Sequence, residues 1–102
     1  MRKINETEFK ELVESGKTIV IDFYADWCGP CRALGPILEE IQEQFPEIEF
    51  CKVNVDEEET LAMGFKIQSI PNVIMIKDGK MVANSLGLKP KDAMIEWIEN
   101  NK

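Results

Sequence analysis

Hydrophobic and polar positions along the chain follow two patterns, and the first of them is typical of β-strands. Residues 18–24 are nearly continuous in apolar and β-forming side chains, which indicates a central strand covered on both faces. The dipeptide Asp78-Gly79 lies between two later runs of this kind and predicts a tight hairpin. The strands predicted in this way are residues 18–24, 48–55, 72–76 and 81–85, with the segment around Ile4 as a candidate for a short first strand.

The second pattern repeats with the period of an amphipathic helix. Asn5 followed by Glu8 resembles a capping box, and Gly16 is a typical helix stop. Pro36 is expected to kink the second helix, because proline lacks a backbone donor and crowds the preceding turn. The predicted helices lie between Asn5 and Gly16, between Gly29 and Pro46, at 57–63 and at 90–100. The residues expected on the buried faces of the second and the last helix are Ile37, Leu38, Ile41 and Phe45, and Met94, Trp97 and Ile98.

The order of these elements, (β)αβαβαββα, predicts a three-layer α/β fold in which helices cover both faces of a sheet. A chain of 102 residues with 44% hydrophobic side chains can build one hydrophobic core and is too short for a second. We therefore expect residues 1–102 to form a single domain.

Charge and composition narrow the range of functions. The chain carries 19 acidic and 12 basic residues, a net charge of −7, so we expect neither nucleic acid nor an anionic membrane as a partner. It has no histidine, which excludes Ser–His–Asp and Cys–His catalysis within the chain. No apolar run approaches the length of a membrane span, and the first residues do not resemble a secretory signal. Because three cysteines are also too few for a disulfide framework, we expect a cytoplasmic protein.

The sharpest chemical signal is the run Trp27-Cys28-Gly29-Pro30-Cys31 at the start of the second predicted helix. Residues three apart on a helix face the same side, which brings the two sulfurs within disulfide reach. Cys28 lies at the helix start, where unpaired N–H groups and the helix dipole favour a thiolate. Cys31 is one turn further in and should be more buried. The pair is therefore typical of an attacking thiol with a resolving partner.

Two simpler interpretations of the cysteines compete with this one. A CxxC motif can form half of a zinc site, but two more ligands are needed and the chain offers only Cys51 and no histidine. The two cysteines could also be unreactive and structural, although a helix N-terminus is where thiols become reactive. We expect no metal site, and Cys51 itself is expected to be a small buried side chain.

The stretch from Ile21 to Arg32 resembles the active-site segment of the thioredoxin family. The resemblance continues through Pro36, Lys52-Val53-Asn54-Val55-Asp56, Ile70-Pro71, Asp78-Gly79 and Gly87, and so covers essentially the whole chain. It implies the thioredoxin fold, with a central mixed sheet of five strands flanked by helices. It further implies a monomer without a bound cofactor, whose dithiol reduces disulfides in other proteins and is restored by a separate thioredoxin reductase.

Asp22 and Lys52 match a carboxylate and a lysine that support the cysteines in this family. Asp22 lies within the apolar strand, where desolvation should raise its pKa so that it can take a proton from Cys31. The alternative for Asp22 is a position on a solvent face of the strand. Lys52 is interpreted as the partner of Asp22, and the alternative for it is a solvated lysine at a sheet edge.

An apolar docking surface is expected around Cys28. Ile70-Pro71 resembles the cis-proline turn that the family packs beside the disulfide. Trp27 is expected to be exposed on this surface, and the alternative for it is packing in the core, where Trp97 is expected. Three positions depart from the family pattern: Tyr24 stands where tryptophan is common, Lys66 where glycine is usual and Asn72 where threonine is normal. The residues of the predicted docking surface are Trp27, Gly29, Pro30, Ile70, Pro71, Gly87 and Leu88.

The sequence thus predicts a protein-disulfide reductase that cycles through a Cys28–Cys31 disulfide. An oxidase or isomerase of the same fold is the alternative within redox chemistry, although the Gly-Pro pair between the cysteines resembles reducing members. The alternative from another class is a binding module that uses the apolar surface without turnover. Acceleration of insulin reduction separates the reductase from the binding module.

Overall fold

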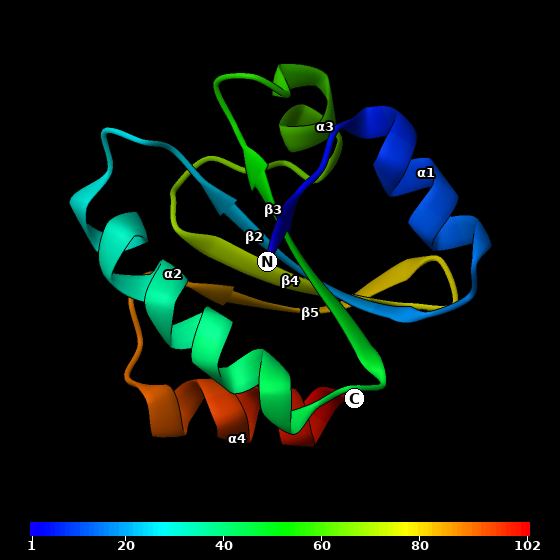
Figure 1. Cartoon of the computed structure of the whole chain (residues 1–102). Coiled ribbons are helices and arrows are strands. Elements are labelled where there is room, and N and C mark those ends of the chain that lie inside the picture. Colours follow the sequence, from blue (N-terminus) through cyan, green and yellow to red (C-terminus); the bar gives the residue numbers. More distant parts are fainter.

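The computed structural model describes all residues, 1–102, and its strands form one mixed sheet (Figure 1). The strand order is β1-β3-β2-β4-β5, in which β1 and β2 run parallel to β3. β4 is antiparallel to β2, and β5 is antiparallel to β4. The strands are β1 (Arg2–Lys3), β2 (Thr18–Tyr24), β3 (Ile48–Asn54), β4 (Asn72–Lys77) and β5 (Lys80–Leu86).

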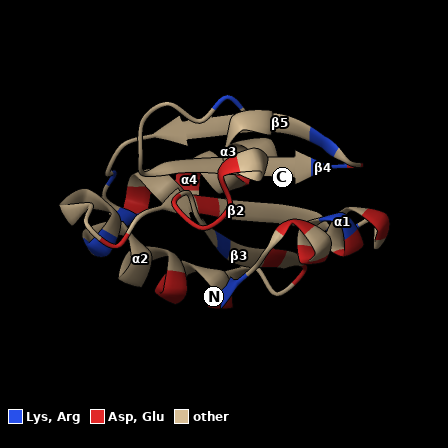
Figure 2. Ribbon diagram, turned by 90° about the horizontal axis from the view of Figure 1, so that it is seen from above, with Lys and Arg blue, Asp and Glu red and all other residues tan.

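Helices cover both faces of this sheet, so the predicted three-layer thioredoxin fold is confirmed. α2 and α4 enclose one core with the inward side chains of one sheet face, and α1 and α3 pack on the other face (Figure 1). None of the helices is both long and apolar enough to cross a membrane. Most acidic residues lie on helices and loops outside the sheet (Figure 2). The helices are α1 (Glu6–Glu14), α2 (Gly29–Ile41), α3 (Glu59–Gly64) and α4 (Lys91–Asn101), with a 3₁₀ turn, η1 (Gln42–Gln44), after α2.

Local signals in the sequence set the ends of several elements. Asn5 Oδ1 accepts from the Glu8 amide at 2.9 Å, and Glu8 Oε1 accepts from the Asn5 amide at 3.0 Å, so the predicted capping box is confirmed. Gly16 follows α1 with φ +78°, a left-handed conformation that glycine adopts without strain. Asp78 and Gly79 both have positive φ and form the two-residue hairpin turn between β4 and β5.

Two helix boundaries differ from the prediction for identifiable reasons. α2 becomes a 3₁₀ turn after Ile41, and Phe45 leaves the helical region with φ −130° because the residue before a proline avoids it. α3 begins at Glu59 rather than two residues earlier. Asn54 causes this delay, since its side-chain oxygen accepts from the amides of Asp56 and Glu57 at 2.8 and 3.3 Å and holds the segment in a turn.

The buried helix faces are shifted slightly from the predicted ones. Leu38, Ile41 and Phe45 are buried as expected, whereas Ile37 is only half-buried and Leu34 is fully buried instead. On α4, Met94 and Ile98 are buried, and Trp97 is half-buried against the edge of the same core. α2 therefore packs one turn closer to the cysteines than expected.

Candidate active site

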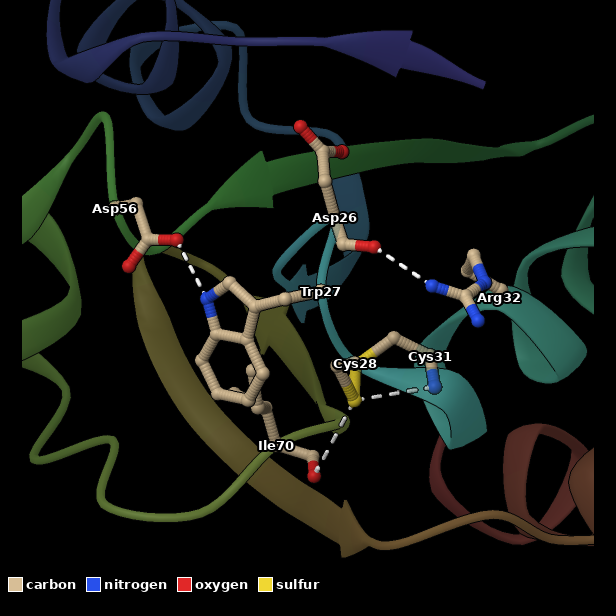
Figure 3. The surroundings of a disulfide bond; sticks show 7 residues. All are labelled: Asp26, Trp27, Cys28, Cys31, Arg32, Asp56 and Ile70. Carbon is tan, nitrogen blue, oxygen red and sulfur yellow. Dashed lines mark hydrogen bonds between the residues drawn. A yellow bond between two sulfur atoms is a disulfide. The ribbon is translucent and has the colours of Figure 1, made fainter.

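The two cysteines lie at the N-terminus of α2, which a short loop of residues 25–27 connects to the end of β2 (Figure 3). Cys28 is the N-cap residue and Cys31 lies in the first turn, which places their Cα atoms 5.2 Å apart, and a disulfide joins them. Cys28 Sγ accepts from the Cys31 amide at 3.2 Å.

Cys28 and Cys31 are both buried in the disulfide form, with 6% and 4% of their surface exposed. The difference in burial expected from the sequence is therefore small. Tyr24, Val55 and Ile70 pack against the cysteines, and the Ile70 carbonyl oxygen lies 3.9 Å from Cys28 Sγ (Figure 3). Gly29 and Pro30 between the cysteines are exposed, and the Cys31 amide is the helix N–H that is directed at the Cys28 sulfur.

Asp22 lies on β2 with 2% of its surface exposed, and its Oδ1 atom has no hydrogen-bond partner. The solvent-facing alternative for Asp22 is therefore wrong. Burial raises the pKa of Asp22 from its ordinary 3.8 to about 7, and the positive charge of Lys52 partly offsets this shift. An acid with such a pKa exchanges its proton near neutral pH.

Lys52 pairs with Asp22 in the β2–β3 register, so the two side chains lie side by side on one face of the sheet. No ion pair within 4.0 Å joins them. The Lys52 ammonium instead lies over the Tyr24 ring, 5.4 Å from its centroid. Lys52 is half-buried and belongs to a central strand, so it is not the solvated edge lysine of the alternative interpretation.

An open cavity of about 910 Å³ lies beside the disulfide and reaches down to the buried carboxylate. Asp22, Cys31, Tyr24 and Lys52 all contribute to its wall. This volume is large enough for many water molecules. The cavity therefore gives Asp22 and Cys31 a common route to solvent on the side away from the Ile70 carbonyl.

Trp27 precedes the disulfide and is 69% exposed, so the alternative of core packing is wrong for this residue. Its indole Nε1 donates to Asp56 Oδ2 at 2.8 Å, which fixes the ring beside the cysteines (Figure 3). On the other side of the loop, Arg32 Nη1 donates to the Asp26 carbonyl at 3.0 Å and ties α2 to the preceding segment (Figure 3). Sequence reasoning did not assign roles to Asp56, Asp26 or Arg32.

The rest of the predicted docking surface comes from the loops before β4 and after β5. The Ile70–Pro71 peptide bond is cis, as the family resemblance implies. The Gly87 amide donates to the Pro71 carbonyl at 2.8 Å and holds the two loops together. Leu88 is 47% exposed and Ile70 is half-exposed. Pro71 is buried, so it supports this surface from below and adds no exposed area.

Comparison with known proteins decides the family to which this site belongs. The sequence profile of the Thioredoxin family matches residues 1–100. The chain belongs to the thioredoxin family. The thioredoxin of Mycoplasmoides gallisepticum is 41% identical over 95 residues, which span 93% of this chain and 95% of the relative. The thioredoxin of Chlamydia trachomatis is 38% identical over 99 residues, 97% of this chain and 96% of the relative. The X-ray structure of Fasciola hepatica thioredoxin superimposes over the full length of both chains with a TM-score of 0.92 at 36% identity.

Membership of the thioredoxin family establishes the general activity. The protein is a thiol-disulfide oxidoreductase of the protein-disulfide reductase type, and Cys28 and Cys31 are its redox-active pair. Thioredoxins carry no cofactor and are re-reduced by a thioredoxin reductase. The function predicted from the Trp27–Cys31 motif is confirmed at this level.

The three departures from the usual thioredoxin pattern have distinct structural settings. Lys66, where glycine is usual, adopts φ +57°, a left-handed conformation that explains why glycine is favoured there. Asn72 is 7% exposed, and its Oδ1 atom has no hydrogen-bond partner. Tyr24 is half-buried and forms part of the cavity wall described above.

Cys51 is remote from this chemistry. It lies on β3 with none of its surface exposed, and burial raises the pKa of its thiol to about 12. At neutral pH it therefore remains a neutral thiol, as expected for a small buried side chain.

Proposed function

We propose that residues 1–102 act as one domain in which Cys28 attacks the disulfides of partner proteins and Cys31 resolves the product. The Cys28 thiolate forms a bond to one substrate sulfur and displaces the other as a thiolate. Cys31 then loses its proton and attacks Cys28 Sγ. The Cys28–Cys31 disulfide forms, the substrate leaves as a dithiol, and two electrons have passed from this chain to the substrate.

Asp22 is the proton acceptor for Cys31 in this proposal. Its pKa of about 7 supports the role, because an acid–base group is most effective when its pKa lies near the working pH. The cavity shared by Asp22 and Cys31 provides the path, with water carrying the proton between them. Lys52 adds a positive charge beside the carboxylate and keeps its pKa from rising further.

The partners in this proposal are a thioredoxin reductase and disulfide-containing proteins. In this proposal the exposed residues Trp27, Gly29, Pro30 and Leu88 and the half-exposed Ile70 form an apolar surface against which an extended substrate segment can lie. Neither nucleic acid nor a membrane is a partner of such an acidic surface, and we place the monomeric protein in the cytoplasm. The observation that carries the proposal is the disulfide at the N-terminus of α2, beside the cavity that leads to Asp22.

Insulin reduction by dithiothreitol tests this function directly. The protein is expected to accelerate precipitation of the reduced insulin chains well above the rate with dithiothreitol alone. Cys28→Ser should abolish the acceleration, whereas Cys51→Ala, a change at the buried cysteine outside the site, should retain it. An unaccelerated reaction with the folded wild-type protein would contradict the reductase activity.

Trp27→Ala is expected to slow the reduction of protein disulfides while leaving the reduction of small disulfides unchanged. The second-order rate constant of the reduced protein with insulin should fall about tenfold, because truncation of a tryptophan anchor typically costs more than 1 kcal/mol of binding. The unfolding free energy should change by no more than about 1 kcal/mol, since the ring is 69% exposed. Stopped-flow measurements with insulin and with cystine separate the two effects.

Met81→Ala is the matched control for this experiment. Met81 is 49% exposed on β5, but it lies at the hairpin end of the strand, away from the Gly87–Pro71 contact. Equal losses with insulin for the Trp27 and Met81 variants would remove Trp27 from the docking surface.

A further inference from the structure

The position of the Lys52 ammonium is not explained by its neighbour Asp22 alone. Lys52 is paired with Asp22 in the sheet, yet no ion pair within 4.0 Å forms between them. Tyr24 follows Asp22 by two residues on β2 and therefore points to the same face of the sheet. It lies diagonally across from Lys52 on the neighbouring strand, within reach of a long side chain. The Lys52 Nζ atom takes this position, 5.4 Å from the ring centroid.

We propose that Tyr24 is a positioning residue, whose ring holds the Lys52 ammonium at the cavity wall and so sets how strongly that charge acts on the Asp22 carboxylate. A cation over an aromatic face at this distance is attracted by the electron-rich ring. The attraction fixes Lys52 near Asp22 without a direct hydrogen bond, which leaves the carboxylate free to exchange a proton. The consequence for catalysis rests on the role of Asp22 proposed above.

The chemistry of the Tyr24 side chain supports a role for its ring and not for a phenolate. Burial raises the pKa of Tyr24 above its ordinary 10.0, so the hydroxyl stays neutral at physiological pH. Lys3, whose charge also acts on the Tyr24 hydroxyl, forms an ion pair with Glu57 at 2.9 Å, and Lys52 is the cation that lies over the ring. Tyr24 therefore offers a neutral aromatic face, and phenylalanine should replace it without loss of this contact.

The other charged groups around the cavity have partners of their own or lie at its rim. Arg32 donates to the Asp26 carbonyl, and Glu40 pairs with Lys91 at 2.7 Å. Among these groups, Lys52 is the one whose charge lowers the pKa of Asp22. The Met1 amino group, which also lines the cavity, pairs with Glu39. In the reduced protein the Cys31 thiol is a further titratable group in the cavity wall. The remaining titratable and charged residues that line the cavity with Asp22 and Lys52 are Tyr24, Asp26, Arg32, Glu39, Glu40 and Glu43.

Removal of the ring should release the Lys52 ammonium into the open cavity. A lysine ammonium is strongly hydrated, and no carboxylate lies within ion-pair distance of Lys52 to hold it in place. Asp22 then loses part of the positive charge beside it, and its pKa rises. The expected rise in the pKa of Asp22 for Tyr24→Leu is about half a unit or more, a part of the roughly 1–3 units that a nearby opposite charge produces.

Carbon-13 NMR titration of the Asp22 carboxyl group in the oxidised protein tests the inference. Tyr24→Leu should raise the pKa of Asp22, whereas Tyr24→Phe and Tyr24→Trp should keep it close to the wild-type value. Lys52→Met alone should raise it at least as much. In the Lys52→Met background, Tyr24→Leu should have no further effect, because the ring acts only through the lysine.

Two results would overturn the positioning role. One is an unchanged Asp22 pKa in folded Tyr24→Leu protein, and the other is an equal rise in the presence and absence of Lys52. The pH dependence of mixed-disulfide resolution then separates this inference from the proposed function. If the Asp22 pKa moves as expected and the pH profile of resolution stays fixed, Tyr24 positions Lys52 but Asp22 is not the proton acceptor.

Discussion

Cys31→Ser is expected to leave substrate proteins covalently bound to Cys28. The variant keeps the attacking thiol at the N-terminus of α2 but lacks the thiol that breaks the mixed disulfide. Turnover in insulin reduction should fall to the uncatalysed rate. The reaction then stops after its first step, and the captured partners report the physiological substrates.

Non-reducing electrophoresis after incubation with insulin provides the measurement. Cys31→Ser should show a new band that dithiothreitol removes, and mass spectrometry should place the linkage at Cys28. Cys28→Ser is the matched control and should trap little, because its remaining thiol lies one turn further into the helix. Equal trapping by the two variants would contradict the assignment of attacking and resolving roles.

Asp22→Asn should stabilise the oxidised protein at neutral and alkaline pH. Burial raises the pKa of the folded-state carboxyl to about 7 from its ordinary 3.8. An acid whose pKa is raised by folding holds a proton that the unfolded chain has already released. Stability therefore falls as the pH rises from about 4 to 7, and the loss is complete above pH 7. At about 1.36 kcal/mol per unit, the full loss is about 4 kcal/mol, and asparagine removes it because it never ionises.

Urea unfolding of both oxidised proteins at pH 5 and pH 8 checks this expectation. The gain in unfolding free energy from Asp22→Asn should be about 2 kcal/mol at pH 5 and about 4 kcal/mol at pH 8. The gain is larger at pH 8 because the buried Asp22 carboxyl of the wild-type protein is then ionised in most molecules. The same substitution should slow insulin reduction, since Cys31 loses its proton acceptor. Equal stability of the two proteins at pH 8 would show that Asp22 carries no buried charge there. An unchanged rate would remove it from proton transfer.

Features encoded by neighbouring residues could be predicted from the sequence. The capping box at Asn5, the hairpin at Asp78-Gly79 and the continuous strand from Thr18 to Tyr24 depend on local backbone preferences, and the structure confirms them. The cysteine pair could also be predicted, because two sulfurs three residues apart at a helix start are within disulfide reach.

Contacts between distant segments could not be predicted in the same way. The Trp27–Asp56 hydrogen bond joins residues 29 positions apart, and nothing in the local pattern singles out that one acid among 19. In the sequence, Tyr24 is notable only because it stands where tryptophan is common in the family. Its contact with Lys52 follows from the register of β2 against β3, which only the folded sheet defines. The turn held by Asn54 likewise makes α3 begin two residues later than the helix predicted at 57–63.

The order of strands in the sheet has a consequence for the newly synthesised chain. β2 and the cysteines leave the ribosome early, but β4, the neighbour of β2 in the sheet, and Gly87, which fixes the Pro71 loop, are made much later. Until β4 and Gly87 have been made, the contacts that hold the Pro71 loop against the cysteines in the folded protein cannot form. The surroundings of Cys28 in the folded protein thus depend on segments from the last third of the chain. A nascent polypeptide that stalls before that point carries the redox pair without the loop that packs against Cys28 in the folded protein.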